Sequence, residues 1–204
     1  MANQKVTIID TGCANFSSVR FALARLGIEA QISADESVIR QADKLILPGV
    51  GTAVAAMQKL NDRHLPELVR SLEQPVLGIC LGMQMMGLAS EESMNSGTAS
   101  IKTLGITPGT VRLMQTGDLP LPHMGWDQVT HDGSCPLFAG LKSGTYFYFV
   151  HSYAMDVIKD TVGVCTYGSQ FTAVFQHDNF FGTQFHPEKS GAAGARLLKN
   201  FIEL

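Results

Sequence analysis

The sequence has little charge and no surplus of basic residues. Only 16% of its 204 residues are Asp, Glu, Lys or Arg, against about 25% in an average globular protein. The 15 Lys and Arg are outnumbered by 18 Asp and Glu, which gives a formal net charge of −3. A general nucleic-acid-binding protein would carry a basic surface, so no nucleic-acid partner is expected. With 45% hydrophobic residues, the chain is also too apolar for intrinsic disorder.

Long apolar segments and paired cysteines are missing as well. The longest apolar run, from Val76 to Ala89, is interrupted by Gln84, and no stretch of about 18 apolar residues could span a membrane. The residues before Asp10 are too few for the apolar region of a signal peptide. The four cysteines form no C-x-x-C pair and have no histidine at zinc-finger spacing. We therefore expect a cytoplasmic protein with free thiols, no metal site and no membrane association.

Short apolar segments alternate with helical patterns along the first half of the chain. The predicted strands are 6–10, 29–32, 44–47 and 75–79, and the predicted helices are 17–26, 34–41, 52–60 and 66–72. Apolar strands separated by amphipathic helices are typical of a parallel sheet that is covered on both faces. Later, turn residues separate predicted strands at 109–114, 145–150, 161–167, 171–176 and 180–185, before a last helix at 191–201. The sequence thus predicts one α/β domain, residues 1–204, with a mostly parallel central sheet flanked by helices and antiparallel strands added in the C-terminal half.

Cys80 lies where the fourth predicted strand gives way to a helical segment. The sequence Gly78-Ile-Cys-Leu-Gly82 has the G-x-C-x-G spacing that parallels the G-x-S-x-G nucleophile elbow. A nucleophile on so sharp a turn has a strained backbone, and only very small residues fit two positions away on either side. The start of the following helix favours a thiolate, and the amide of Leu81 is placed to donate to an oxyanion. The alternative is that Cys80 is one more small buried residue.

His186-Pro-Glu188 follows the last predicted strand, at the sheet edge where α/β proteins build their sites. Residues i and i+2 of an extended chain point the same way, so Glu188 can orient the His186 imidazole. A histidine at a strand end is more often a structural hydrogen-bonding residue. Combined with Cys80, however, the motif supplies a nucleophile, a base and an orienting acid. We therefore interpret Cys80, His186 and Glu188 as the catalytic residues.

Three motifs together resemble the class I glutamine amidotransferase family. They are the turn Pro48-Gly-Val-Gly51, the elbow Gly78-Ile-Cys-Leu-Gly-Met-Gln84, and Phe185-His-Pro-Glu188. The resemblance implies a flavodoxin-like α/β fold that needs no cofactor. It also implies that the side-chain amide of L-glutamine is hydrolysed through a glutamyl thioester on Cys80, with His186 acting first as base and then as acid. Glutamate and ammonia would be the products.

Further segments resemble the glutaminase subunits of imidazole glycerol phosphate synthase, an enzyme of histidine biosynthesis. These segments are Asp10-Thr-Gly-Cys-Ala-Asn15, Leu121-Pro-His-Met-Gly-Trp126, Tyr148-Phe-Val-His-Ser-Tyr153 and His186-Pro-Glu-Lys-Ser190. Such a subunit passes ammonia to a separate cyclase subunit with a TIM-barrel fold, which makes imidazole glycerol phosphate and AICAR. The resemblance therefore implies a heterodimer, and the absence of a fused cyclase domain fits a stand-alone subunit. Asp127 stands where the family often has Asn, a departure that leaves the glutaminase chemistry untouched.

The resemblance also implies which residues contact the glutamine substrate. Gly51, Gln84, Ser152 and Tyr153 are the implied contacts. Gln84 follows Cys80 by one helical turn and should lie on the same face of the helix, although a helical glutamine can simply face solvent. Ser152 and Tyr153 follow a predicted strand, where polar residues are common.

An oxyanion in such a site normally needs two N–H donors. Leu81 at the elbow supplies one of them, and the Gly49–Val50 peptide is expected to supply the second through the N–H of Val50. Glycine permits either orientation of that peptide at little steric cost. The second donor can therefore be absent at rest and be turned inward when the cyclase binds its own ligand.

Trp126, the only tryptophan, lies in a stretch that we interpret as a loop, residues 122–127. A lone tryptophan is usually part of the core, but aromatic residues on loops often anchor protein interfaces. The resemblance places Trp126 at the partner interface, with Tyr148 and Lys189 on the same face near the tunnel mouth. Alternatively, Tyr148 is an ordinary aromatic residue of a strand, and Lys189 is a lysine that faces solvent.

Other functions fit the motifs less well. The glutaminase of another synthase, of the anthranilate, aminodeoxychorismate or vitamin B6 type, would lack the segments around Trp126 and Tyr148. A DJ-1-like protein or other cysteine hydrolase would keep the elbow, but His-Pro-Glu after the last strand is not expected there. A pure binding module would not need the three catalytic residues. The glycines after the third strand lack the third member of a dinucleotide-binding motif.

Overall fold

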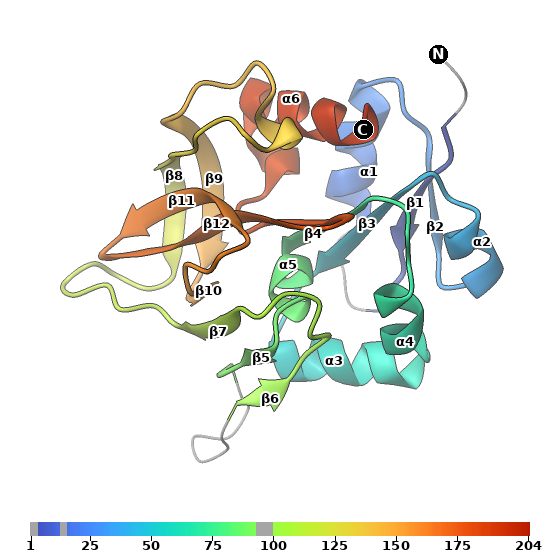
Figure 1. Ribbon diagram of the computed structural model, residues 1–204, viewed down its shortest axis with the longest axis horizontal. Helices are drawn as coiled ribbons and strands as arrows, with labels where there is room; N and C mark the ends of the chain where they lie inside the picture. The colour runs from blue at the N-terminus through green and yellow to red at the C-terminus, as the bar shows by residue number, and fades with distance from the viewer. Residues whose placement is uncertain (1–3, 13–15, 93–99) are drawn as a thin grey trace.

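The computed structural model describes residues 4–12, 16–92 and 100–204, so Cys13 and Asn15 lie outside the described residues. Within these ranges the main sheet has seven strands in the order β11-β12-β13-β4-β3-β1-β2 (Figure 1). In chain order these strands are β1 (Val6–Ile9), β2 (Ala30–Ser33), β3 (Lys44–Gly49), β4 (Val76–Cys80), β11 (Thr161–Tyr167), β12 (Ser169–His177) and β13 (Phe180–Thr183). The pairs β1–β2, β1–β3, β3–β4 and β4–β13 are parallel, whereas β12 and β11 join antiparallel. The predicted mostly parallel sheet with antiparallel C-terminal additions is therefore confirmed.

Helices cover both faces of this sheet (Figure 1). They are α1 (Phe16–Arg25), α2 (Glu36–Arg40), α3 (Ala53–Asp62), α4 (Leu65–Arg70), α5 (Leu81–Met85) and α6 (Gly191–Ile202). Successive residues of a strand point to opposite faces. Ile8 accordingly packs in the core with α1 and α6, and Ile9 packs with α3, α4 and α5. No helix in the described ranges is long and apolar enough to cross a membrane.

The strand β3 continues further than predicted. The sequence places its end before Pro48, but β3 runs on through Pro48 and Gly49, which pair with Ile79 and Cys80 of β4. The pairing of β3 with β1 stops at Ile46, so no neighbour on that side requires the N–H that proline lacks. This extension places Gly49 directly beside Cys80.

Two smaller sheets lie beside the main one. The first has the order β10-β7-β5-β6 and the second consists of β8 and β9. Their strands are β5 (Ala89–Ser90), β6 (Ile101–Lys102), β7 (Thr110–Leu113), β8 (His123–Val129), β9 (Thr145–His151) and β10 (Tyr153–Met155). The expected loop at 122–127 is wrong, because most of it belongs to β8. Seven consecutive antiparallel pairs with β9 form this strand, and the residues of the segment do not by themselves predict that pairing.

Candidate active site

Cys80 ends β4 and immediately precedes α5, with a positive φ of 52° and a ψ of −111°. Its neighbours explain why the turn can form. A Cβ added to Gly82 would lie 1.8 Å from the carbonyl oxygen of Leu47, and one added to Gly78 would lie 2.8 Å from the backbone N of Met83. Only glycine fits at both positions, so the elbow geometry expected from the G-x-C-x-G spacing is present. A strained conformation at a non-glycine residue is a common feature of functional sites.

His186 and Glu188 lie at the carboxyl end of β13. Nδ1 of His186 is 2.8 Å from Oε1 of Glu188. The expected extended geometry is wrong: Pro187–Lys189 forms a 3₁₀ turn, which brings the Glu188 carboxylate back to the ring. Ser190 fixes this turn because its hydroxyl donates to the carbonyl of His186 at 2.7 Å. Glu188 thus orients the imidazole, although through a turn.

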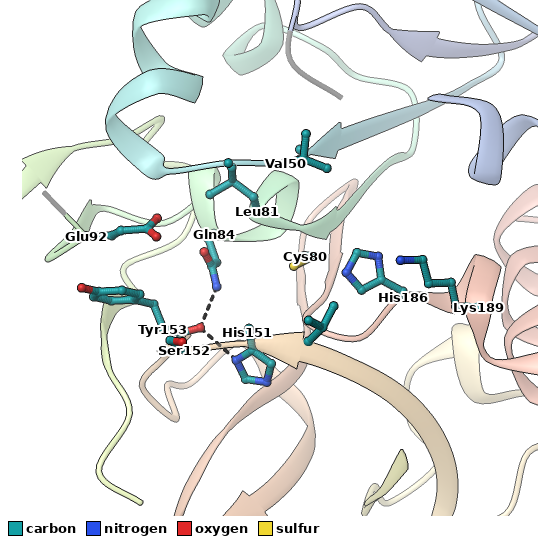
Figure 2. A pocket seen from close by; sticks show the side chains of 13 residues that line it. Val50, Cys80, Leu81, Gln84, Glu92, His151, Ser152, Tyr153, His186 and Lys189 are labelled. Carbon is teal, nitrogen blue, oxygen red and sulfur yellow. Dashed lines mark hydrogen bonds between the residues drawn. The ribbon is translucent and has the colours of Figure 1, made fainter. Parts of the chain in front are cut away.

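The second ring nitrogen of His186 is directed at the thiol. Nε2 is buried, and Figure 2 shows the ring beside Cys80 in the pocket. Burial by itself lowers the pKa of His186. The hydrogen bonds and negative charges of Cys80 and Glu188 outweigh this effect and raise the pKa to about 9. The ring can therefore hold a proton taken from the thiol at neutral pH.

The other described cysteines lack such a partner. Cys135 and Cys165 are buried, and burial raises the pKa of their thiols to about 11 and about 12. A thiol that stays protonated is a poor nucleophile. Of the described cysteines, Cys80 alone combines access to a pocket with a basic neighbour.

A cavity of about 330 Å³ opens beside Cys80 (Figure 2). It brings together the three groups predicted around the nucleophile: the residues of the oxyanion site, the glutamine contacts, and His186. The lining consists of Gly49, Val50, Gly51, Cys80, Leu81, Gln84, Glu92, Val150, His151, Ser152, Tyr153, His186 and Lys189. In the described ranges no group of three or more His, Cys, Asp or Glu residues could hold a metal ion.

Gln84 does not face solvent. Its side chain is 4% exposed, and Nε2 donates to the carbonyl of Tyr153 at 2.7 Å and to Oε1 of Gln184 at 2.9 Å. The amide of Gln184 in turn lies 3.7 Å from Sγ of Cys80. Sequence analysis missed Gln184, although its position directly before Phe185-His186 was a usable signal.

Glu92 is a second pocket residue that the sequence analysis missed. Its carboxylate accepts a hydrogen bond from the backbone N of Ala53 at 2.8 Å, and burial raises its pKa. Figure 2 shows Glu92 at the opposite side of the pocket from His186. No motif marks this glutamate, because its contact with the pocket arises from the packing of α3 against the segment after β5.

Trp126, Tyr148 and Lys189 lie together, and Lys189 lines the pocket. Trp126 and Tyr148 are cross-strand partners on β8 and β9, with edge-to-face rings whose centroids are 6.1 Å apart. Nζ of Lys189 lies 5.9 Å from the centre of the Tyr148 ring. Trp126 is 54% exposed, so it is not a core residue. Together with exposed Met124 and Tyr146, Trp126 and Tyr148 form an apolar surface that we call the β8–β9 patch.

Comparison with known proteins identifies the family of the chain. Residues 7–204 match the family of class I glutamine amidotransferases, and the chain belongs to that family. Among solved structures, PurLQS from Thermotoga maritima superimposes with a TM-score of 0.71 at 18% identity, covering 98% of each chain. A glutamine amidotransferase from the same organism gives a TM-score of 0.61 at 18% identity, covering 100% of this chain and 82% of the other. These two structures establish likeness of fold.

Relatives at higher identity are more specific. The chain is 55% identical over 204 residues, the full length of both proteins, to imidazole glycerol phosphate synthase subunit HisH 1 of Vibrio vulnificus. It is 56% identical over 201 residues to the HisH subunit of Vibrio cholerae, covering 98% of this chain and 99% of that protein. The HisH subunit of Yersinia pestis is 55% identical, with the same coverage. Within the amidotransferases, the chain is thus similar over its whole length to HisH subunits.

Proposed function

We propose that this chain is the glutaminase subunit of an imidazole glycerol phosphate synthase in histidine biosynthesis. It hydrolyses glutamine and supplies the ammonia to a cyclase subunit with a TIM-barrel fold. The observation that carries the proposal is Cys80, with its positive φ, beside His186, whose Nδ1 is held by Glu188. The identity to HisH subunits supports the choice of this synthase. We further propose that residues 1–204 act as one domain in the cytoplasm.

The pocket geometry supports a two-step reaction at Cys80. The thiolate attacks the side-chain carbonyl carbon of glutamine, and the negative charge that develops on oxygen is held by the N–H groups of Leu81 and Val50. His186 donates the proton that it took from the thiol to the leaving nitrogen, which departs as ammonia and leaves a thioester. Water then attacks the thioester with His186 as base, and glutamate leaves as the thiolate reforms.

Recognition of the amino-acid part of glutamine is assigned to the far side of the pocket. The carboxylate of Glu92 binds the α-ammonium group, since it is an anion that faces the same cavity as Cys80. Gly51, Gln84, Ser152 and Tyr153 surround the rest of the substrate. The β8–β9 patch, next to Lys189 at the pocket edge, is where we place the cyclase subunit.

Cys80→Ala tests this function. The substitution removes one sulfur atom, and alanine is close enough in size to keep the backbone conformation. We therefore expect loss of glutamine hydrolysis with unchanged folding. Glutamate production should be measured on the full chain mixed with its cyclase subunit, next to a circular-dichroism spectrum of each variant. Retained hydrolysis in Cys80→Ala would assign the reaction to another group. Loss of secondary structure together with activity would make Cys80 a structural residue.

A further inference from the structure

A chain of hydrogen-bonded groups leads from Asp127 on β8 to the pocket. Its outer member is Asp127, which follows Trp126 on β8. Oδ2 of Asp127 lies 3.4 Å from Nε2 of His123. Nδ1 of His123 lies 3.2 Å from Nε2 of His151. Nδ1 of His151 lies 3.0 Å from the carbonyl oxygen of Tyr153. Both imidazoles are buried, and His151 lines the cavity beside Cys80.

The carbonyl of Tyr153 determines the direction of these bonds. A carbonyl oxygen only accepts, so Nδ1 of His151 carries the proton. Burial, aided by the charges of His123 and His186, lowers the pKa of His151 to about 3. The ring is therefore neutral, and its Nε2 is an acceptor. It follows that Nδ1 of His123 donates to His151.

Asp127 decides whether this arrangement is complete. When His123 is protonated, Nδ1 donates to His151 and Nε2 donates to Asp127, so every contact is favourable. When His123 is neutral, it has one N–H and can donate to only one of its two acceptors, Asp127 or His151. Burial lowers the pKa of His123, and Asp127 opposes that shift. The titratable groups in contact with His123 are Asp127 on β8, His151 on β9 and Tyr167 on β11.

The Tyr153 carbonyl also accepts the hydrogen bond of Gln84, as Figure 2 shows. Two donors, Gln84 and His151, therefore hold one oxygen atom between them. The position of the Gln84 carboxamide in the pocket depends on that oxygen. The ring of His123 is stacked between the rings of Phe149 and Tyr167, so both of its faces are packed.

We propose that Asp127, His123 and His151 form a relay of positioning residues, which holds the Tyr153 carbonyl and, through it, Gln84 in the orientation that binds glutamine. The inference rests on the proposed function, because it takes glutamine as the ligand of the pocket. It gives Asp127 a role: this half-buried carboxylate acts on the substrate site through two buried imidazoles.

Variants of the full chain in complex with its cyclase subunit test the relay. His123→Phe keeps the stacking but removes the donor, and His151→Leu removes the donor to Tyr153. In both variants we expect the KM for glutamine to rise about threefold to tenfold, the effect of one lost hydrogen bond, with kcat nearly unchanged. His151→Asn is the matched control, because its amide can donate from the position of Nδ1, and it should restore most of the affinity.

Asp127→Asn separates the relay from simple packing. Its amide can donate to Nε2 of a neutral His123, so the relay is complete at every pH. The KM of the wild-type complex should fall as the pH is lowered through the pKa of His123, below its ordinary 6.5, whereas the KM of Asp127→Asn should not change over that range. The histidine ¹⁵N NMR spectrum of the free full chain, which requires no turnover, should show His151 protonated at Nδ1.

The outcomes distinguish the two levels of inference. A wild-type complex that hydrolyses no glutamine would overturn the proposed function and the relay with it. An active complex in which His123→Phe and His151→Leu keep the wild-type KM would overturn the relay alone. A proton on Nε2 of His151 would do the same, even if a variant failed to fold. Equal KM losses in His151→Leu and His151→Asn would show that packing, and not the N–H donor, is what matters.

Discussion

At the scale of single residues, Cys80 and Glu188 together raise the proton affinity of His186. The raised pKa of about 9 reflects the charges and hydrogen bonds of Cys80 and Glu188, which overcome the opposing effect of burial. In the proposed reaction, the protonated ring is the acid that donates to the leaving ammonia. Activity should therefore be present below this pKa and should be lost as the pH rises through it.

Glu188→Gln removes the negative charge and so lowers the pKa of His186. We expect the alkaline limb of kcat against pH to move to lower pH, and kcat near neutrality to fall by less than in Cys80→Ala, because the nucleophile is still present. Steady-state assays from about pH 6 to about pH 10 measure both effects. An alkaline limb in the wild-type position, or a loss equal to that of Cys80→Ala, would contradict this assignment.

At the scale of elements, the contact between α5 and β3 makes the elbow possible. A methyl group at Gly82 would collide with the backbone of Leu47, and backbone cannot move aside as a flexible side chain can. We expect Gly82→Ala to lower the free energy of unfolding by about 3 kcal/mol or more, the upper range for overpacking. Urea denaturation measures this change.

Gly27→Ala is the control for Gly82→Ala. Gly27 has a φ of +78°, and an added Cβ would have no atom within 4 Å. Its cost is backbone strain alone, about 1 kcal/mol. Equal destabilisation by the two substitutions would show that the collision with Leu47 is relieved by movement of α5.

Trp126 is exposed to solvent on the β8–β9 pair, so its proposed role in binding the partner can be tested by substitution. Trp126→Ala should weaken binding of the cyclase subunit by about 2 kcal/mol or more if Trp126 is a buried anchor of the complex. The melting temperature of the free chain should hardly change, because Trp126 is 54% exposed. Leu88→Ala, at a residue that is 55% exposed and outside the patch, controls for loss of apolar surface. Normal association of Trp126→Ala with a large fall in melting temperature would contradict the interface assignment.

At the scale of the whole molecule, the site lies where β3, β4 and β13 all end, as parallel strands in α/β proteins dictate. Gly49 at the end of β3 pairs with Cys80, and Val50 beyond it is 43% exposed. The loop that is expected to supply the second oxyanion donor thus has one end fixed by the sheet and the other open to solvent. A bound partner can reach it directly.

We expect this loop to keep the free chain nearly silent. Removing one oxyanion donor lowers the rate by a factor of about 10²–10³. A free chain slowed in this way would release little ammonia in the absence of an acceptor. The kcat/KM for glutamine should therefore be lowest for the chain alone, higher with the cyclase subunit, and highest when the cyclase also carries its ligand. A free chain that is already as active as the ligand-loaded complex would exclude control by the Gly49–Val50 peptide.

Much of the architecture and chemistry was determined by the sequence alone. Continuous apolar segments predicted the strands of the parallel sheet, because a strand buried on both faces has no polar alternation. The spacing around Cys80 predicted the elbow, since two glycines are a local requirement of that turn. The motif at His186 predicted a histidine next to a glutamate for the same reason: the two residues are neighbours in the chain.

Only the tertiary structure decided what depends on distant contacts. The strand β8 exists through its pairing with β9. Gln84 meets Gln184 across 100 positions of sequence, and His123 meets His151 across 28. Glu92 enters the pocket by the packing of α3. Such contacts leave no periodicity or spacing in the chain, because the free energy that forms them comes from the packing of whole elements and not from local residue preferences.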